Sequence, residues 1–178
     1  LDIDDLPAKV DLAVGGEQLH AEAPDNRAFD WGMGDEAATE AAFASAAHRV
    51  ALQVEDNRII VNTMEPRGCF ANWAEGRLQF TYGGQGVWAM KKQLSDKLGL
   101  AAEDVHVTTP DVGGGFGMKA MPYPEYFVVA QAARLLGRPV LWMSDRSEAM
   151  LSDNAGRDLT SLAELAFDAD LRITGYRV

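Results

Sequence analysis

Four glycines lie within five positions at Gly113–Gly117 and follow the short apolar run Val105–Thr109, which is expected to form a strand. Glycine tolerates positive φ and lets a ligand approach the main chain, so such a loop can direct several N–H groups at one anionic or oxo-bearing group. A sharp structural turn is the alternative. Because four glycines lose much backbone entropy when they become ordered, a role in ligand binding or close packing is favoured.

A second glycine-flanked segment, Tyr82–Gly86, carries one polar amide, Gln85, where a predicted strand gives way to a predicted helix. A helix N-terminus offers unpaired N–H groups and the positive end of the helix dipole, and an amide side chain beside it can donate or accept. Capping of the helix is the simpler interpretation of Gln85, and the sequence alone favours it.

Neither of the common nucleotide-binding loops fits the glycine-rich segment. The phosphate loop of nucleotide hydrolases needs Gly-Lys-Ser/Thr, whereas Met118 separates Gly117 from Lys119, and Ala120 follows. The dinucleotide fingerprint needs a helix that begins inside the loop, and the two prolines of Met121–Pro124 delay that helix. No Rossmann site is expected.

Taken together, four motifs give a more specific signal than either loop alone. Asn62–Gly68, Thr81–Gln85, Pro110–Lys119 and Pro139–Arg146 resemble, in the same order, the molybdenum-binding large subunit of the xanthine dehydrogenase, aldehyde oxidase and aerobic carbon monoxide dehydrogenase family. The likeness runs from about Glu22 to the end of the sequence.

The resemblance implies cofactor-binding roles for Gln85, Gly114, Gly115, Phe116 and Gly117. In that family the matching glutamine hydrogen-bonds an oxygen ligand of the molybdenum, and the matching Phe-Gly lines the metal and the pterin through backbone amides. The pterin's own sulfurs hold the metal, so no residue of this sequence is expected to be a metal ligand. The family's catalytic glutamate lies near the end of the full subunit, so no catalytic residue is expected here, and Glu65 beside Arg67 is interpreted as a structural ion pair.

The resemblance also implies a molybdopterin-type molybdenum cofactor, expected in its cytosine dinucleotide form, in an oxidoreductase. The full enzyme would oxidise a small carbonyl, a heterocycle or carbon monoxide with oxygen from water, and pass electrons to an iron–sulfur small subunit and an FAD medium subunit or domain. Purine-hydroxylating members carry a glutamate where this sequence has Ala120, so a xanthine-type substrate is not expected. The surrounding residues are more similar to the carbon monoxide dehydrogenase-like branch, although Cys69 does not match that branch's cysteine loop.

Composition limits the remaining classes of function. The 178 residues are 47% hydrophobic, as in a packed globular protein, and carry a net charge of −11, which argues against general binding of nucleic acid or anionic membranes. The single cysteine, Cys69, excludes an internal disulfide and any iron–sulfur cluster or structural zinc site built by this sequence alone. No apolar run is long enough for a membrane span. A cytoplasmic location is expected.

The elements that would position the loops indicate an α+β fold: a two-layer arrangement in which two main helices pack on a mixed β-sheet, as part of a larger molybdenum cofactor-binding domain. Hydrophobic periodicity predicts helices near residues 36–47, 86–98 and 125–136, and strands near 50–55, 58–62, 78–82, 105–109, 140–143, 163–167 and 171–173. The strand at 58–62 is expected to pair with 50–55 as a hairpin, and the strand at 140–143 is expected to be buried.

Residues 1–34 are rich in acidic and turn-forming residues and are expected to be a linker, with residues 35–178 forming the first, incomplete part of a molybdopterin-binding domain. The first residue is Leu1, and the last, Val178, closes a strand-like run, so a fragment of a longer subunit is expected. Alone, it is expected to be inactive and to lack the cofactor. The alternative is a non-catalytic binding or assembly module whose glycine loop is structural.

Overall fold

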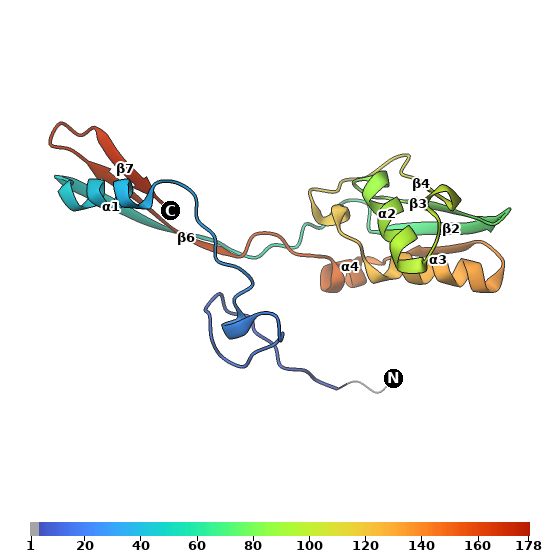
Figure 1. Cartoon of the computed structure of the whole chain (residues 1–178). Helices are drawn as coiled ribbons and strands as arrows, with labels where there is room; N and C mark the ends of the chain where they lie inside the picture. The colour runs from blue at the N-terminus through green and yellow to red at the C-terminus, as the bar shows by residue number, and fades with distance from the viewer. Residues whose placement is uncertain (1–3) are drawn as a thin grey trace. The chain divides into compact units, whose positions relative to one another are not determined.

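The structure, a computed structural model, describes residues 4–178, which divide into two compact units (Figure 1). The first unit contains residues 4–58 and 157–178, and the second contains Ile59–Gly156. The chain therefore leaves the first unit, builds the whole second unit and returns. The predicted division at residue 34 into a linker and a cofactor domain remains a prediction.

The first unit is a three-stranded antiparallel sheet with one helix on it. Its strands are β1 (His48–Asp56), β6 (Leu159–Phe167) and β7 (Ile173–Arg177), in the order β1-β6-β7, and its helix is α1 (Glu36–Ser45). The Asp35 carboxylate caps α1 by accepting the Ala38 N–H at 2.9 Å. The predicted first helix and the closing hairpin are confirmed. A short 3₁₀ turn, Pro24–Asn26, precedes α1.

The predicted hairpin between residues 50–55 and 58–62 is wrong. β1 instead pairs along its length with β6, from His48 opposite Phe167 to Asp56 opposite Leu159. In the 58–62 segment, Ile59 makes only an isolated bridge with Gly156. Local alternation marks a strand but not its partner, and here the partner follows the entire second unit in the sequence.

The second unit is a four-stranded mixed sheet with two main helices on one face. The strands, in spatial order β4-β3-β2-β5, are β4 (Val105–Thr108), β3 (Arg77–Tyr82), β2 (Gly68–Ala74) and β5 (Val140–Met143), and only β3 and β4 are parallel. The helices are α2 (Val87–Leu98), α3 (Pro124–Leu136) and the short α4 (Arg146–Ser152), with 3₁₀ turns at Ala102–Asp104 and Met118–Ala120. The predicted α+β class is confirmed.

The core of the second unit lies between its sheet and helices α2 and α3. Leu78, Phe80 and Tyr82 on β3 are buried against Leu94 of α2 and Tyr126 of α3. Both helices end at a glycine with left-handed φ, 63° at Gly99 and 60° at Gly137.

Three features of the second unit differ from the prediction. β2 was missed because its buried positions include the small residues Cys69 and Ala71, which weaken the alternation. α4 was missed although Asp145 and Glu148 form a capping box, a signal that is readable in the sequence. β5 is not fully buried, because Leu141 and Met143 on its outer face are exposed. No helix within residues 4–178 has the length and apolar character needed to cross a membrane.

Candidate functional site

Two glycine loops meet at one edge of the mixed sheet. β3 and β4 are parallel neighbours, with Leu78 opposite Val105 and Thr81 opposite Thr108, so their carboxyl ends reach the same edge. β3 leads directly into Gly83–Gly86, and β4 leads into Gly113–Gly117. The topology of the sheet therefore brings together two segments that are remote in sequence.

A hydrogen bond joins the two loops. The Gly117 N–H donates to Gln85 Oε1 at 2.9 Å, and the Gln85 N–H donates to the Lys119 carbonyl at 3.2 Å. A Cβ added at Gly115 would lie 2.5 Å from Gln85 Oε1, so a larger residue there would displace the Gln85 side chain from this position. Because the carbonyl oxygen of Gln85 accepts from Gly117, the NH₂ group of this exposed residue remains available as a donor.

Capping of the helix, the simpler interpretation of Gln85, is wrong. The N-cap residue of α2 is Gly86, and no side chain caps this helix. Thr109 anchors the first loop, because its hydroxyl accepts a hydrogen bond from the Gly84 N–H and donates one to the Gly84 carbonyl. The Tyr82 hydroxyl also donates to the Gly86 carbonyl at 3.1 Å. A Cβ at Gly84 would lie 1.8 Å from the Tyr82 ring, so this close approach also requires glycine.

The second loop presents main-chain donors and one aromatic ring. Within residues 4–178, no acceptor is found for the N–H groups of Gly114, Gly115 and Phe116. Phe116 has a φ of 52° and a side chain that is 80% exposed, an unusual combination for a large apolar residue. Such outliers cluster at ligand sites, where the surrounding structure maintains the strain.

Glu65 contacts the second loop from the segment that precedes β2. Its Oε2 accepts hydrogen bonds from the Gly113 N–H at 2.8 Å and from Lys119 Nζ at 2.7 Å. Partial burial acts to raise the pKa of Glu65, but these two hydrogen bonds outweigh it and hold the pKa below its usual value. The predicted pairing of Glu65 with Arg67 is wrong, because Arg67 binds Glu125 and Asp153 instead.

The protein groups of this site are donors rather than metal ligands. Among residues 4–178, no group of three or more His, Cys, Asp or Glu side chains could hold a metal ion. Burial raises the pKa of the Cys69 thiol to about 12, which keeps it protonated at neutral pH. An array of N–H groups beside an amide suits a group that carries its own metal ligands together with oxo or phosphate oxygens.

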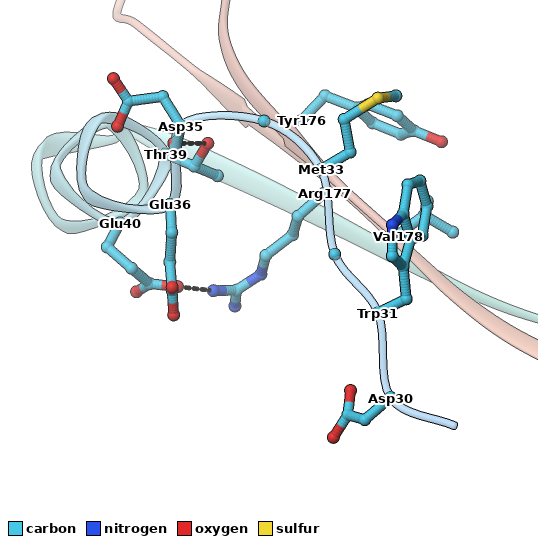
Figure 2. A pocket seen from close by; sticks show the side chains of 12 residues that line it. Asp30, Trp31, Met33, Asp35, Glu36, Thr39, Glu40, Tyr176, Arg177 and Val178 are labelled. Carbon is cyan, nitrogen blue, oxygen red and sulfur yellow. Dashed lines mark hydrogen bonds and ion pairs between the residues drawn. The ribbon is translucent and has the colours of Figure 1, made fainter. Parts of the chain in front are cut away.

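A cavity of about 650 Å³ lies in the first unit and is lined by residues 30–36 and the end of β7 (Figure 2). Several carboxylates surround Arg177, whose guanidinium is paired with Glu40 and with Glu164, both at 2.6 Å. Arg177, the only cationic side chain among the described residues that line this cavity, is therefore already neutralised. None of the glycine-loop residues lines the cavity. Despite its volume, the described lining of this cavity has no set of free donors comparable to that of the glycine loops.

Comparison with known proteins identifies the fold family. Residues 19–178 match the molybdopterin cofactor-binding domain. The chain belongs to this family. It is 35% identical over 177 residues to the carbon monoxide dehydrogenase large chain of Hydrogenophaga pseudoflava, covering 98% of this chain and 21% of that protein. It is 34% identical over 165 residues to the nicotine 6-hydroxylase large subunit of Paenarthrobacter nicotinovorans, covering 92% of this chain and 20% of that protein.

The three-dimensional comparison agrees with this assignment. A solved structure of reconstituted CO dehydrogenase from Oligotropha carboxidovorans matches with a TM-score of 0.76 and 32% identity, over 80% of this chain and 18% of that one. The resemblance drawn from the four sequence motifs is thereby confirmed. This molybdopterin cofactor-binding domain spans about a fifth of the length of the curated relatives.

All five predicted site residues lie in the two loops, and the structure joins Gln85 to Gly115 and Gly117. Their contact with a cofactor remains a prediction. Lys119 and Thr109 were not among the predicted site residues, because a buried lysine and a threonine beside a glycine loop have no distinctive local pattern. Glu65 was interpreted as structural, but its partner was misassigned.

Proposed function

We propose that this chain forms part of the molybdopterin cofactor pocket of a molybdenum hydroxylase large subunit, with Gln85 and Gly114–Gly117 contacting the cofactor. The observation that carries the proposal is the hydrogen bond between the Gly117 N–H and Gln85 Oε1. It holds the Gln85 amide, with its NH₂ group free to donate, in the same loop cluster as three N–H groups that have no acceptor within residues 4–178. Family membership supports the same cofactor class.

The residues present fit such a cofactor. When bound, it would supply the redox chemistry, in which the substrate gains an oxygen atom from water and two electrons and two protons are released. The chain's own task is to hold the cofactor by donating hydrogen bonds from Gln85 and the glycine-loop main chain. The aromatic ring of Phe116 would exclude water from the same surface. Prearranged donors of this kind need little reorganisation when charge develops.

The substrate class proposed is a small carbonyl, a heterocycle or carbon monoxide. Two similar proteins are named for carbon monoxide and nicotine, which supports substrates of this range. Ala120 provides no carboxylate beside Lys119, so a purine is not proposed. The cytosine dinucleotide form of the cofactor, an iron–sulfur and an FAD partner, and a cytoplasmic location belong to the same proposal.

The test uses the full-length subunit that contains this chain. Gln85→Ala and Phe116→Ala are expected to lower both turnover and the molybdenum and pterin bound per subunit. Gln79→Ala is a matched control, because Gln79 is an exposed glutamine on β3. Normal metal content and turnover in both site variants would show that the residues are wrongly assigned and would favour a purely structural role for the glycine loop.

The 178-residue chain alone is expected to bind no cofactor and to be inactive, because it spans only about a fifth of the length of its relatives. Metal analysis of the purified chain checks this. Stoichiometric molybdenum in the isolated chain would contradict the expectation.

A further inference from the structure

Lys119 is a buried cation beneath the glycine loop. Its side chain is fully buried, and its Nζ donates to Glu65 Oε2 at 2.7 Å, while the Glu65 side chain is 36% exposed. A buried ammonium group without a partner is strongly unfavourable, and the Glu65 carboxylate is the partner that this buried position requires.

The Glu65 carboxylate holds both ends of the loop at once. The same Oε2 atom accepts the Gly113 N–H at 2.8 Å, at the start of the loop, and Lys119 Nζ, just beyond its end. The Glu65 N–H also donates to the Gly113 carbonyl at 3.1 Å. Gly113 and Lys119 are thus fixed to one residue, which limits the directions that the N–H groups between them can take.

The ion pair also reaches the first loop. The main-chain carbonyl of Lys119 accepts the Gln85 N–H at 3.2 Å. A Cβ added at Gly83 would lie 2.9 Å from Glu65 Oε2, and one added at Gly113 would lie 2.5 Å from Glu65 Cβ. The carboxylate therefore sits between the two glycine loops in a space that larger residues would close.

Glu65 is itself firmly supported. The buried Thr63 hydroxyl donates to the Glu65 carbonyl at 2.6 Å. Arg146, at the start of α4, donates to the carbonyl of Thr63 at 2.8 Å and to that of Met64 at 3.0 Å. These hydrogen bonds hold the main chain around Glu65 in place, so the carboxylate has a fixed base from which to position the loop.

We propose that the Glu65–Lys119 ion pair is a positioning device that sets the direction of the glycine-loop N–H groups and of Gln85 toward the cofactor. This inference rests on the proposed function. Neither side chain needs to touch the cofactor, so both act through the two loops. As a general precedent, mutation of groups that orient the residues around a metal centre typically costs about 10–100-fold in metal affinity or activity.

The experiment compares Lys119→Met, Glu65→Met and the double variant in the full-length enzyme. Glu65→Met leaves a buried cation unpaired and is expected to lower the urea midpoint of unfolding most. The double variant removes both charges and is expected to recover most of that stability. Molybdenum and pterin per subunit are expected to stay below wild type in all three, because affinity for the cofactor falls by about tenfold or more. Full cofactor content in the stable double variant would overturn the proposal.

Further variants keep the test decisive if Glu65→Met does not fold. Glu65→Asp retains the charge but is one methylene too short to reach both Gly113 and Lys119, so it is expected to fold and still to lose cofactor. The control is the double variant Lys92→Met with Asp96→Met, which removes an exposed ion pair on α2. It is expected to leave the cofactor content unchanged. Normal cofactor content in Glu65→Asp would contradict the proposal.

Gln85→Ala and Gly115→Ala separate the two ideas. If these direct-contact variants retain all their cofactor, the proposed function itself fails. If they lose it while the ion-pair variants keep it, only the positioning role fails. In the fraction of Glu65→Asp that still holds metal, a changed Mo(V) electron paramagnetic resonance spectrum is expected, which a purely stabilising ion pair would not produce.

Discussion

Arg67 links three elements of the second unit through one buried guanidinium. Its Nε donates to Asp153 Oδ1 at 2.5 Å, and its two terminal nitrogens donate to the Glu125 carboxylate at 3.1 and 3.3 Å. It also lies 3.7 Å from the centre of the Tyr123 ring. The Tyr123 hydroxyl in turn donates to the Met118 carbonyl, so this network supports the end of the glycine loop.

Replacing Arg67 with methionine is expected to lower the free energy of unfolding substantially. It leaves the buried Asp153 carboxylate uncompensated, which typically costs about 3–5 kcal/mol of unfolding free energy. Urea denaturation at pH 7 measures the loss. Arg58→Met, which removes an exposed pair with Asp158, is the control and is expected to cost about 1 kcal/mol or less. An Arg67→Met chain as stable as this control would refute the expected role.

The same network predicts the acid sensitivity of the fold. Burial acts to raise the pKa of Glu125, but its hydrogen bonds with Arg67 outweigh this and hold the pKa below its usual value. Ionised Glu125 therefore contributes stability that is fully present above the unfolded pKa, about 4.3, and is lost as the pH falls through the lower folded pKa. Glu125→Gln is expected to flatten this loss in urea titrations between pH 7 and pH 3. An unchanged pH slope would exclude Glu125 as its source.

At the scale of elements, α2 and α3 both end on a left-handed glycine. Gly137→Ala places a Cβ on a residue with a φ of 60° and is expected to destabilise the second unit by about 1 kcal/mol. Gly156→Ala is the control, because Gly156 lacks positive φ and has open space around its Cα. Thermal unfolding of both variants measures the difference, and equal midpoints would contradict this account of the helix end.

The longer helices could be predicted from the sequence, whereas the pairing of distant strands and loops could not. The helices were predictable because a 3.6-residue period and a terminal glycine are local signals, as in Val87–Leu98 followed by Gly99. The partner of β1 was not predictable, because β6 lies beyond the whole second unit. For the same reason the two glycine loops could be located from their own residues and from the family resemblance, but their contact and the Glu65–Lys119 pair required the tertiary structure.

At the scale of the whole molecule, one face of the β1-β6-β7 sheet is apolar and exposed. The strand register places Val50, Leu165 and Tyr176 side by side, and Leu52 and Val54 follow on the same face. Val50, Leu52 and Tyr176 are 56%, 61% and 58% exposed. The opposite face contains the fully buried Ala166, whose cross-strand neighbour Gly175 lies against Ala42 and Phe43 of α1. A continuous exposed apolar face is unusual for a monomer in water.

The 178-residue chain is therefore expected to self-associate as its concentration rises, because association removes this face from water. Sedimentation velocity over a concentration series measures this. Leu52→Lys is expected to shift the distribution toward monomer. Gln53→Lys adds the same charge on the opposite face and is expected to leave association nearly unchanged. If both variants behave alike, net charge rather than the apolar face controls the association.

The insertion of the second unit between β1 and β6 has a consequence for synthesis. β1 leaves the ribosome before any residue of Ile59–Gly156, whereas its hydrogen-bonding partner leaves after all of them. At the usual 5–20 residues per second, β1 would stay unpaired for on the order of ten seconds. The second unit makes its sheet contacts internally and can fold during that delay, which would bring the two ends of the insertion together and shorten the search by which β6 finds β1.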